Sequence, residues 1–252
     1  MHFNPINRYF KICIVFISLI FLSGCESNYQ WGWYTISPYN KTGLSNLKFL
    51  LSGLNFTILV SLISIFFSII IGLFVAVMSS SSNSLIRYLN IGYTEIIRAI
   101  PVLVMILWVY YGLPVVFNLN FSAFVAGIIA LSICDSPFIS EIFRSGIEAV
   151  PNGQKEAGAS LGLKSIQTFF LITLPQAIKI ILPALGNQFV YMLKMSSLVS
   201  IIGLNELTRK ANELVVSQYR PLEIYTFLVL EYLVLILIVS FLVRKLEKKL
   251  KT

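Results

Sequence analysis

The stretch EAGASLGLKSIQTFFLITLP, residues 156–175, is a polar interruption in an otherwise strongly apolar chain. Its apolar residues recur at steps of three and four: Leu163, Ile166, Phe169, Phe170 and Leu174. That spacing places them on one face of a short amphipathic helix. The stretch therefore predicts a helix that lies along a membrane surface.

Two glycines and a proline add further constraints to this stretch. Gly158 and Gly162 lie one helical turn apart, and the missing side chains would let another segment approach closely. Pro175 is expected to end or kink the helix, because its ring clashes with the preceding turn. We therefore predict a helix–bend–helix hairpin that is built for contact with another protein.

The composition around the hairpin indicates a polytopic membrane protein. Of the 252 residues, 57% are hydrophobic and 12% are charged, whereas a soluble domain has about 25% charged residues. Five uncharged or nearly uncharged segments are long enough to cross a bilayer: about 56–78, 91–116, 121–139, 180–202 and 225–243. The sequence thus predicts an all-α membrane protein with five core spans.

Charge sets the expected orientation. The formal net charge is +8, which would also suit a nucleic-acid partner, but the basic residues lie between the spans and favour a topology signal. Thirteen lie on the side of the hairpin: Arg8, Lys11, Arg87, Arg98, Arg144, Lys155, Lys164, Lys179, Arg244, Lys245, Lys248, Lys249 and Lys251. The opposite side has five, namely Lys41, Lys48, Arg209, Lys210 and Arg220, and Lys194 lies within a span. The hairpin and the basic tail 244–252 are therefore predicted to be cytoplasmic, with no nucleic-acid partner.

The N-terminal segment 1–25 has two interpretations. Arg8 and Lys11 precede a short apolar run, and the run ends in Leu22-Ser23-Gly24-Cys25. This resembles a lipoprotein signal that is cleaved before Cys25, which would then be lipidated. The alternative is an uncleaved extra helix. Segment 26–52, which is rich in Trp and Tyr, is expected at the outer membrane interface.

Several separated motifs resemble one transporter family. Glu156-Ala157-Gly158, then Gly162-Leu163, then Ile172-x-Leu174-Pro175 is similar to the EAA loop of ATP-binding-cassette (ABC) importer permeases. EIIRAIPVLVMILWVYYGLP (95–114), SEIFRSGIEAVPNGQ (140–154) and PQAIKIILPALGNQFVYMLKMSSLVSIIG (175–203) resemble the polar amino-acid subfamily. The resemblance covers roughly 53–243, which we take as the permease domain.

The resemblance implies a type I ABC importer permease fold, a location in a bacterial inner membrane, and a set of partners. The hairpin would be the coupling helix, docked in a groove of an ATPase subunit, with Gly158 at a position where alanine is commoner. No GxxxxGK[ST] pattern occurs in the sequence, so ATP and Mg²⁺ are expected on a separate ATPase and this chain is expected to bind no cofactor. Other expected partners are an extracytoplasmic solute-binding protein, a second permease copy or a sister permease, and a polar amino acid.

Ionisable residues inside the spans are candidates for the substrate pathway, because charge is costly there. Lys194 matches a family lysine, but the aspartate that usually follows is replaced by Met195, ahead of Ser196. Asp135 could supply that missing carboxylate, or could form a structural ion pair with Lys194. Pro101, which frees a backbone carbonyl, either lines the pathway or kinks the packing. Glu231 has no assigned role.

Two other classes of function fit less well. Scattered carboxylates and one histidine, His2, do not form a catalytic set or a metal site, so the chain is not expected to be an enzyme. A membrane channel or assembly protein that is not coupled to ATP is the main alternative. It would have no use for a coupling hairpin. Two pairs of charges at a spacing of three, Glu95/Arg98 and Glu141/Arg144, are predicted to form ion pairs.

Overall fold

The computed structural model describes residues 29–251, of which residues 33–251 belong to one compact unit. Its main helices are α2 (Lys41–Ser52), α3 (Leu54–Ser79), α4 (Ser84–Ala99), α5 (Val102–Leu107), α6 (Leu113–Phe117), α7 (Ala123–Glu148), α8 (Asn152–Ser160), α9 (Ser165–Thr168), α10 (Leu174–Met195), α11 (Leu207–Gln218) and α12 (Pro221–Lys251). Short 3₁₀ turns occupy Trp33–Ile36 and Ser196–Ile202, and π-helical turns occupy Trp108–Gly112 and Phe169–Thr173. No strand occurs in this part of the chain.

Four stretches are long and apolar enough to cross a membrane: Lys41–Ser79, Ala123–Glu148, Ser165–Ile202 and Pro221–Leu250. A fifth arises if α4 and the Val102–Phe117 segment count as one broken span. These two are bent by 98° at Ile100–Pro101, so the span predicted over 91–116 is a broken one, and the kink considered for Pro101 is present. Proline disfavours a helical conformation in the residue before it, and Ile100 is accordingly extended.

Side-chain caps fix where several helices begin. Asn83 Oδ1 accepts a hydrogen bond from the Leu85 amide at the start of α4, and Ser122 Oγ accepts one from Val125 at the start of α7. The Glu206 carboxylate accepts from the amides of Thr208 and Arg209 at the start of α11. These caps satisfy amides that the helix itself leaves unpaired.

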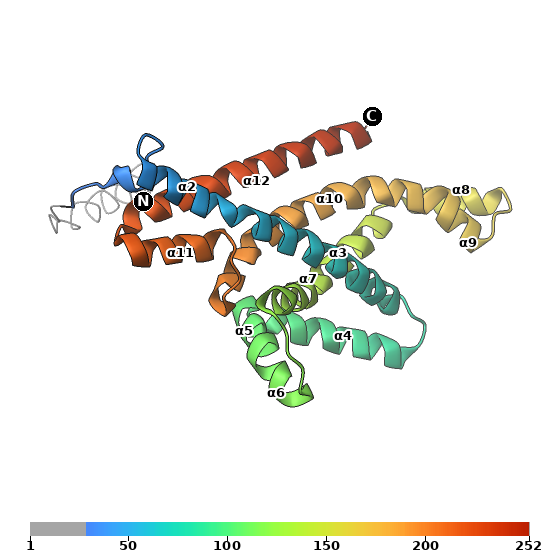
Figure 1. Ribbon diagram of the computed structural model, residues 1–252. Coiled ribbons are helices and arrows are strands. Elements are labelled where there is room, and N and C mark those ends of the chain that lie inside the picture. Colours follow the sequence, from blue (N-terminus) through green and yellow to red (C-terminus); the bar gives the residue numbers. More distant parts are fainter. Residues whose placement is uncertain (1–28, 252) are drawn as a thin grey trace, which may run out of the picture. The chain divides into compact units, whose positions relative to one another are not determined.

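The most extensive contact between two helices of the described chain joins α3 to α7 (Figure 1). Small residues on α3 make this possible: Ser61, Ser64, Ser68 and Gly72 are all buried. A methyl group at Gly72 would lie 2.6 Å from Cβ of Ile139 on α7. In lipid, helices associate through such close packing and through polar contacts.

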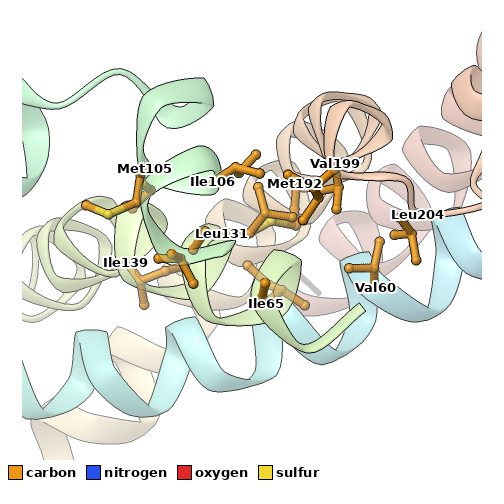
Figure 2. Close-up of a cluster of buried hydrophobic side chains, with 14 residues drawn as sticks. Val60, Ile65, Met105, Ile106, Leu131, Ile139, Met192, Val199 and Leu204 are labelled. Atoms are coloured by element: carbon orange, nitrogen blue, oxygen red, sulfur yellow. The ribbon is translucent and has the colours of Figure 1, made fainter. Parts of the chain in front are cut away.

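The apolar core lies where α3, α5, α7 and α10 meet. Figure 2 shows Ile106 and Met192 close to Leu131, with Val60 and Ile65 of α3 nearby. A second buried cluster joins α2, α11 and α12 and contains Ile36, Leu50, Leu207, Ala211, Leu214, Ile224 and Leu228. The hairpin α8–α9 and the helix α11 lie at opposite ends of this unit (Figure 1).

Candidate functional site

The hairpin predicted from residues 156–175 is present as α8, a tight turn and α9. Gly162 occupies the turn with a φ of +79°, a conformation that favours glycine. The Leu163 amide donates to the Gly158 carbonyl over 3.1 Å, which closes the end of α8. At the start of α9 the Lys164 amide donates to Oε1 of Gln167 over 2.9 Å. The turn is therefore held by backbone geometry and by local hydrogen bonds.

The two glycines have different roles. Gly158 is buried, and a Cβ there would lie 2.9 Å from Cδ1 of Ile172 and 3.0 Å from Cγ2 of Thr168. A Cβ on Gly162 would meet nothing within 4 Å. The predicted close approach is confirmed at Gly158 and is wrong at Gly162, which is needed for the turn.

The helix after the turn passes through Pro175 and does not end there. The stretch Ser165–Ile202 is continuous, and the π-helical turn Phe169–Thr173 comes directly before α10, in whose first turn Pro175 lies. A π-helical turn widens the backbone, and a proline in a first turn lacks only an amide that the helix does not use. The prediction that the helix ends at Pro175 is therefore wrong, and the irregularity in the helix is the π-helical turn that directly precedes this proline.

Most of the hairpin surface is exposed. Glu156 and Ala157 are open to the surroundings, and so are the apolar side chains of Leu161, Ile166 and Phe170. Leu161, at the tip, is 80% exposed. Exposed apolar groups next to charged ones are typical of a surface that another protein covers.

The second candidate region surrounds Asp135, midway along α7. The Asp135 side chain is 3% exposed. Ser68 of α3 donates to its Oδ2 over 2.7 Å, and the amide of Gln188 on α10 donates to its Oδ1. Ser136, the next residue, is hydrogen-bonded to the Tyr93 hydroxyl over 2.7 Å. One carboxylate thus joins three helices that are far apart in sequence.

The ion pair between Asp135 and Lys194 is not formed. Among residues 29–251 the ion pairs found do not include Lys194, whose side chain is exposed. Ser196 is buried, and its hydroxyl donates to the Leu193 carbonyl. Sequence reasoning found Asp135 but missed Ser68 and Gln188, because nothing in a linear pattern pairs residues 67 and 53 positions apart.

Asp135 and Met195 line one small cavity together with Tyr191 and Val102, the residue after Pro101. The cavity volume is about 20 Å³, which is room for a single water. Asp135, Met195 and the neighbour of Pro101 are therefore brought together, whereas Lys194 and Ser196 do not line this cavity.

The predicted charge pairs have different outcomes. Arg144 binds Glu141 over 2.6 Å and Glu148 over 2.9 Å, so that pair is confirmed. Arg98 does not pair with Glu95: one of its guanidinium nitrogens donates to the Pro137 carbonyl over 3.1 Å. Across the described part of the chain no group of three His, Cys, Asp or Glu side chains is placed to hold a metal.

Outside the membrane segments, one buried acid has an altered pKa. Burial raises the pKa of Glu206 from 4.5 to about 7, against the hydrogen bonds from the Thr208 and Arg209 amides and the Tyr232 hydroxyl, which favour its ionised form. Glu206 lies between the last two spans and caps α11, the helix at the end of the unit opposite the hairpin (Figure 1).

Residues 1–28 lie outside the described part of the chain, so the lipoprotein signal or extra helix over 1–25 falls there, Cys25 included. The family and relatives found by comparison give no support to a lipoprotein signal.

Comparison with known proteins yields a consistent group. The family model of the binding-protein-dependent transport system inner membrane component matches residues 68–252. The probable glutamine ABC transporter permease protein GlnM of Bacillus subtilis is 38% identical over 206 residues, covering 82% of this chain and 95% of the relative. The glutamine transport system permease protein GlnP of Escherichia coli K12 is 31% identical over 223 residues, covering 88% and 99%.

Solved structures similar to this chain come from the same class of transporter. The crystal structure of an amino acid ABC transporter with histidines superposes with a TM-score of 0.80 at 37% identity, covering 88% of this chain and all of that one. The MetNI methionine ABC transporter, at 19% identity and a TM-score of 0.70, shares the fold. The chain therefore belongs to the family of inner membrane components of binding-protein-dependent transport systems, and it is a permease subunit of an ABC importer, with ATP hydrolysis carried by a separate subunit.

Proposed function

We propose that this permease imports a polar amino acid of the glutamine or arginine type. The observation that carries the proposal is the likeness, over more than four fifths of the chain, to relatives named as glutamine and arginine permeases. The solute-binding protein would deliver the amino acid to the outer loops, residues 114–121 and 203–222. Two permease chains, either identical or sisters, and two ATPase subunits would complete the importer.

The hairpin is the proposed point of contact with the ATPase. Glu156, Ala157 and the exposed Leu161 offer a surface to dock, and the packing of Gly158 on Thr168 joins both arms of the hairpin into one body. The excess of basic residues on this side supports a cytoplasmic location, with the C-terminus on the same side. ATP and Mg²⁺ would be held by the ATPase, whose closure would move the hairpin as a rigid unit.

Asp135 is the proposed contact for the positive group of the substrate. Both of its hydrogen-bond donors, Ser68 and Gln188, are neutral. Among residues 29–251 the buried carboxylate therefore has no cation paired with it, and an ammonium or guanidinium would supply one. The cavity beside it holds about 20 Å³, so admitting an amino acid requires α7 and α10 to separate.

The test is uptake of labelled glutamine and arginine by vesicles that contain the permease, the ATPase and the solute-binding protein. Uptake should require ATP and should be abolished by deleting residues 155–162, while the protein still inserts in the membrane. A channel would still conduct after this deletion. Uptake that survives the deletion, or that proceeds without ATP, would contradict the proposal.

A further inference from the structure

A second polar cavity lies between α4 and α7, next to the end of α3. Its volume is about 150 Å³, several times the roughly 30 Å³ that a water occupies in the liquid. The wall combines hydroxyl groups of Ser79, Thr94 and Ser140 with charges of both signs. This cavity is separate from the one beside Asp135, with which it shares no lining residue.

Two of the charges that line it are not paired with each other. Glu95 and Arg98 are three residues apart on α4, yet no ion pair joins them, and within residues 29–251 Glu95 makes no hydrogen bond. The Arg98 guanidinium lies 5.1 Å from the Phe138 ring centre and donates one bond to the Pro137 carbonyl, which leaves other N–H groups free. A carboxylate and a guanidinium thus face one cavity, each with binding capacity to spare.

A buried amide completes the wall. Asn90 of α4 is only 7% exposed, and its Oδ1 has no hydrogen-bond partner in the structure. An unsatisfied buried acceptor costs about 1–3 kcal/mol. A donor that enters the cavity from outside the chain would remove that cost.

We propose that this cavity binds the head group of a free α-amino acid. The ammonium would donate to the Glu95 carboxylate and to Asn90 Oδ1, and the carboxylate would accept from the Arg98 guanidinium. The second arginine, Arg144, is already engaged by Glu141 and Glu148. A simple anion would leave Glu95 and Asn90 without a donor, and a simple cation would leave the remaining N–H groups of Arg98 without an acceptor.

The position of the cavity indicates from which side of the membrane its ligand comes, and this step rests on the proposed function. Ser79 ends α3 and Arg144 lies near the end of α7, close to the hairpin that we place in the cytoplasm. The site therefore takes the imported class of molecule from the product side. Because its walls come from α4 and α7, an occupied site ties these two helices together.

The test measures binding of labelled L-glutamine and L-arginine to the permease–ATPase complex in lipid nanodiscs, without the solute-binding protein. Glu95→Gln and Asn90→Leu should each weaken binding about tenfold or more, because each removes a buried or charge-assisted hydrogen bond. Glu95→Asp should restore part of it. Glutaramate, which is glutamine without its amino group, should compete at least about tenfold less well than glutamine.

Two controls separate this site from the substrate pathway and from misfolding. Asp135→Asn should leave the Glu95-dependent part of the binding unchanged, and the Glu95 and Asn90 variants should each keep at least the thermal midpoint of the wild type. Binding that is unaffected by Glu95→Gln and Asn90→Leu, or equal competition by glutaramate, would overturn the inference. A complex that imports amino acids but lacks this binding would refute the cavity alone and leave the proposed function standing.

Discussion

The contact between α3 and α7, which we call the seam, and the hairpin α8–α9 both depend on a glycine, but for different purposes. In the seam, Gly72 and three buried serines bring two long helices into contact, and Ser132 donates to the Ser64 carbonyl across it. In the hairpin, Gly158 is buried while most of its neighbours on α8 are exposed. The seam is closed to its surroundings, whereas the hairpin is nearly all surface.

This difference indicates how motion would pass through the molecule. A seam with close backbone contact and internal hydrogen bonds moves as one body. A hairpin whose two arms pack through Gly158 transmits displacement without bending, while its exposed residues remain available to a partner. The comparison predicts that seam substitutions damage folding and that hairpin substitutions damage coupling.

The largest expected effect is on the seam. Gly72→Ala places a methyl group 2.6 Å from the branched Cβ of Ile139, which cannot rotate away. Overpacking of this kind costs about 1–3 kcal/mol, so we expect a lower thermal midpoint and less folded protein in detergent. Gly92→Ala on α4 is the matched control, because a Cβ there meets nothing within 4 Å. Equal midpoints for the two variants would contradict the close seam.

The hairpin should respond in transport and not in folding. Gly158→Leu would push Thr168 and Ile172 away and change the angle between the two arms. We expect ATP-driven uptake to fall about tenfold or more, because a changed angle between the arms would misplace the surface that docks on the ATPase, with little change in thermal midpoint. Gly153→Leu on the same helix, where the added side chain starts in open space, should retain most of its uptake. A loss of folding in Gly158→Leu would contradict this expectation and would show that Gly158, like Gly72, is needed for folding.

A smaller effect is expected at Asp135 of α7, which we propose contacts the positive group of the substrate. Asp135→Asn removes the charge and leaves an amide N–H₂ facing a donor from Ser68 or Gln188. We expect the Michaelis constant for a cationic amino acid to rise several-fold, with a modest loss of stability. Unchanged uptake and unchanged substrate range would remove Asp135 from the substrate pathway.

The smallest effect concerns pH at the end opposite the hairpin. Because burial raises the pKa of Glu206 to about 7, the folded protein binds a proton more tightly than the unfolded chain between pH 4.5 and about 7. This contribution to stability is complete below pH 4.5 and is lost as pH rises through 7. The thermal midpoint should fall by a few degrees over that range, and Glu206→Gln should flatten the profile. An unchanged slope in that variant would assign the pH dependence to other groups.

Much of the fold follows from the sequence, because runs of uncharged residues and the EAA-like stretch are local signals. The residues of the hairpin and the importance of Gly158 could be predicted in this way. A kink at Pro101 could also be predicted, but the size of that bend and the π-helical turn before Pro175 could not, since a proline permits several backbone solutions and the surrounding helices select among them.

The candidate site was less predictable than the fold. Spacing alone favours a Glu95–Arg98 pair, yet Arg98 reaches a carbonyl on α7 that no local pattern reveals. Likewise, Asp135 stands out as an intramembrane charge, but its partners come from α3 and α10. Long-range contacts of this kind depend on how helices pack, which the linear pattern does not contain.

The most direct test of the account is site-directed crosslinking between the hairpin tip and the ATPase. Leu161→Cys, at the exposed tip of the hairpin, and Val216→Cys on α11 would be compared in vesicles that contain the whole importer, with the native cysteines replaced by serine. We predict that a short bifunctional reagent joins the ATPase to residue 161 and not to residue 216. Linkage at 216, or none at 161, would contradict the coupling role of the hairpin.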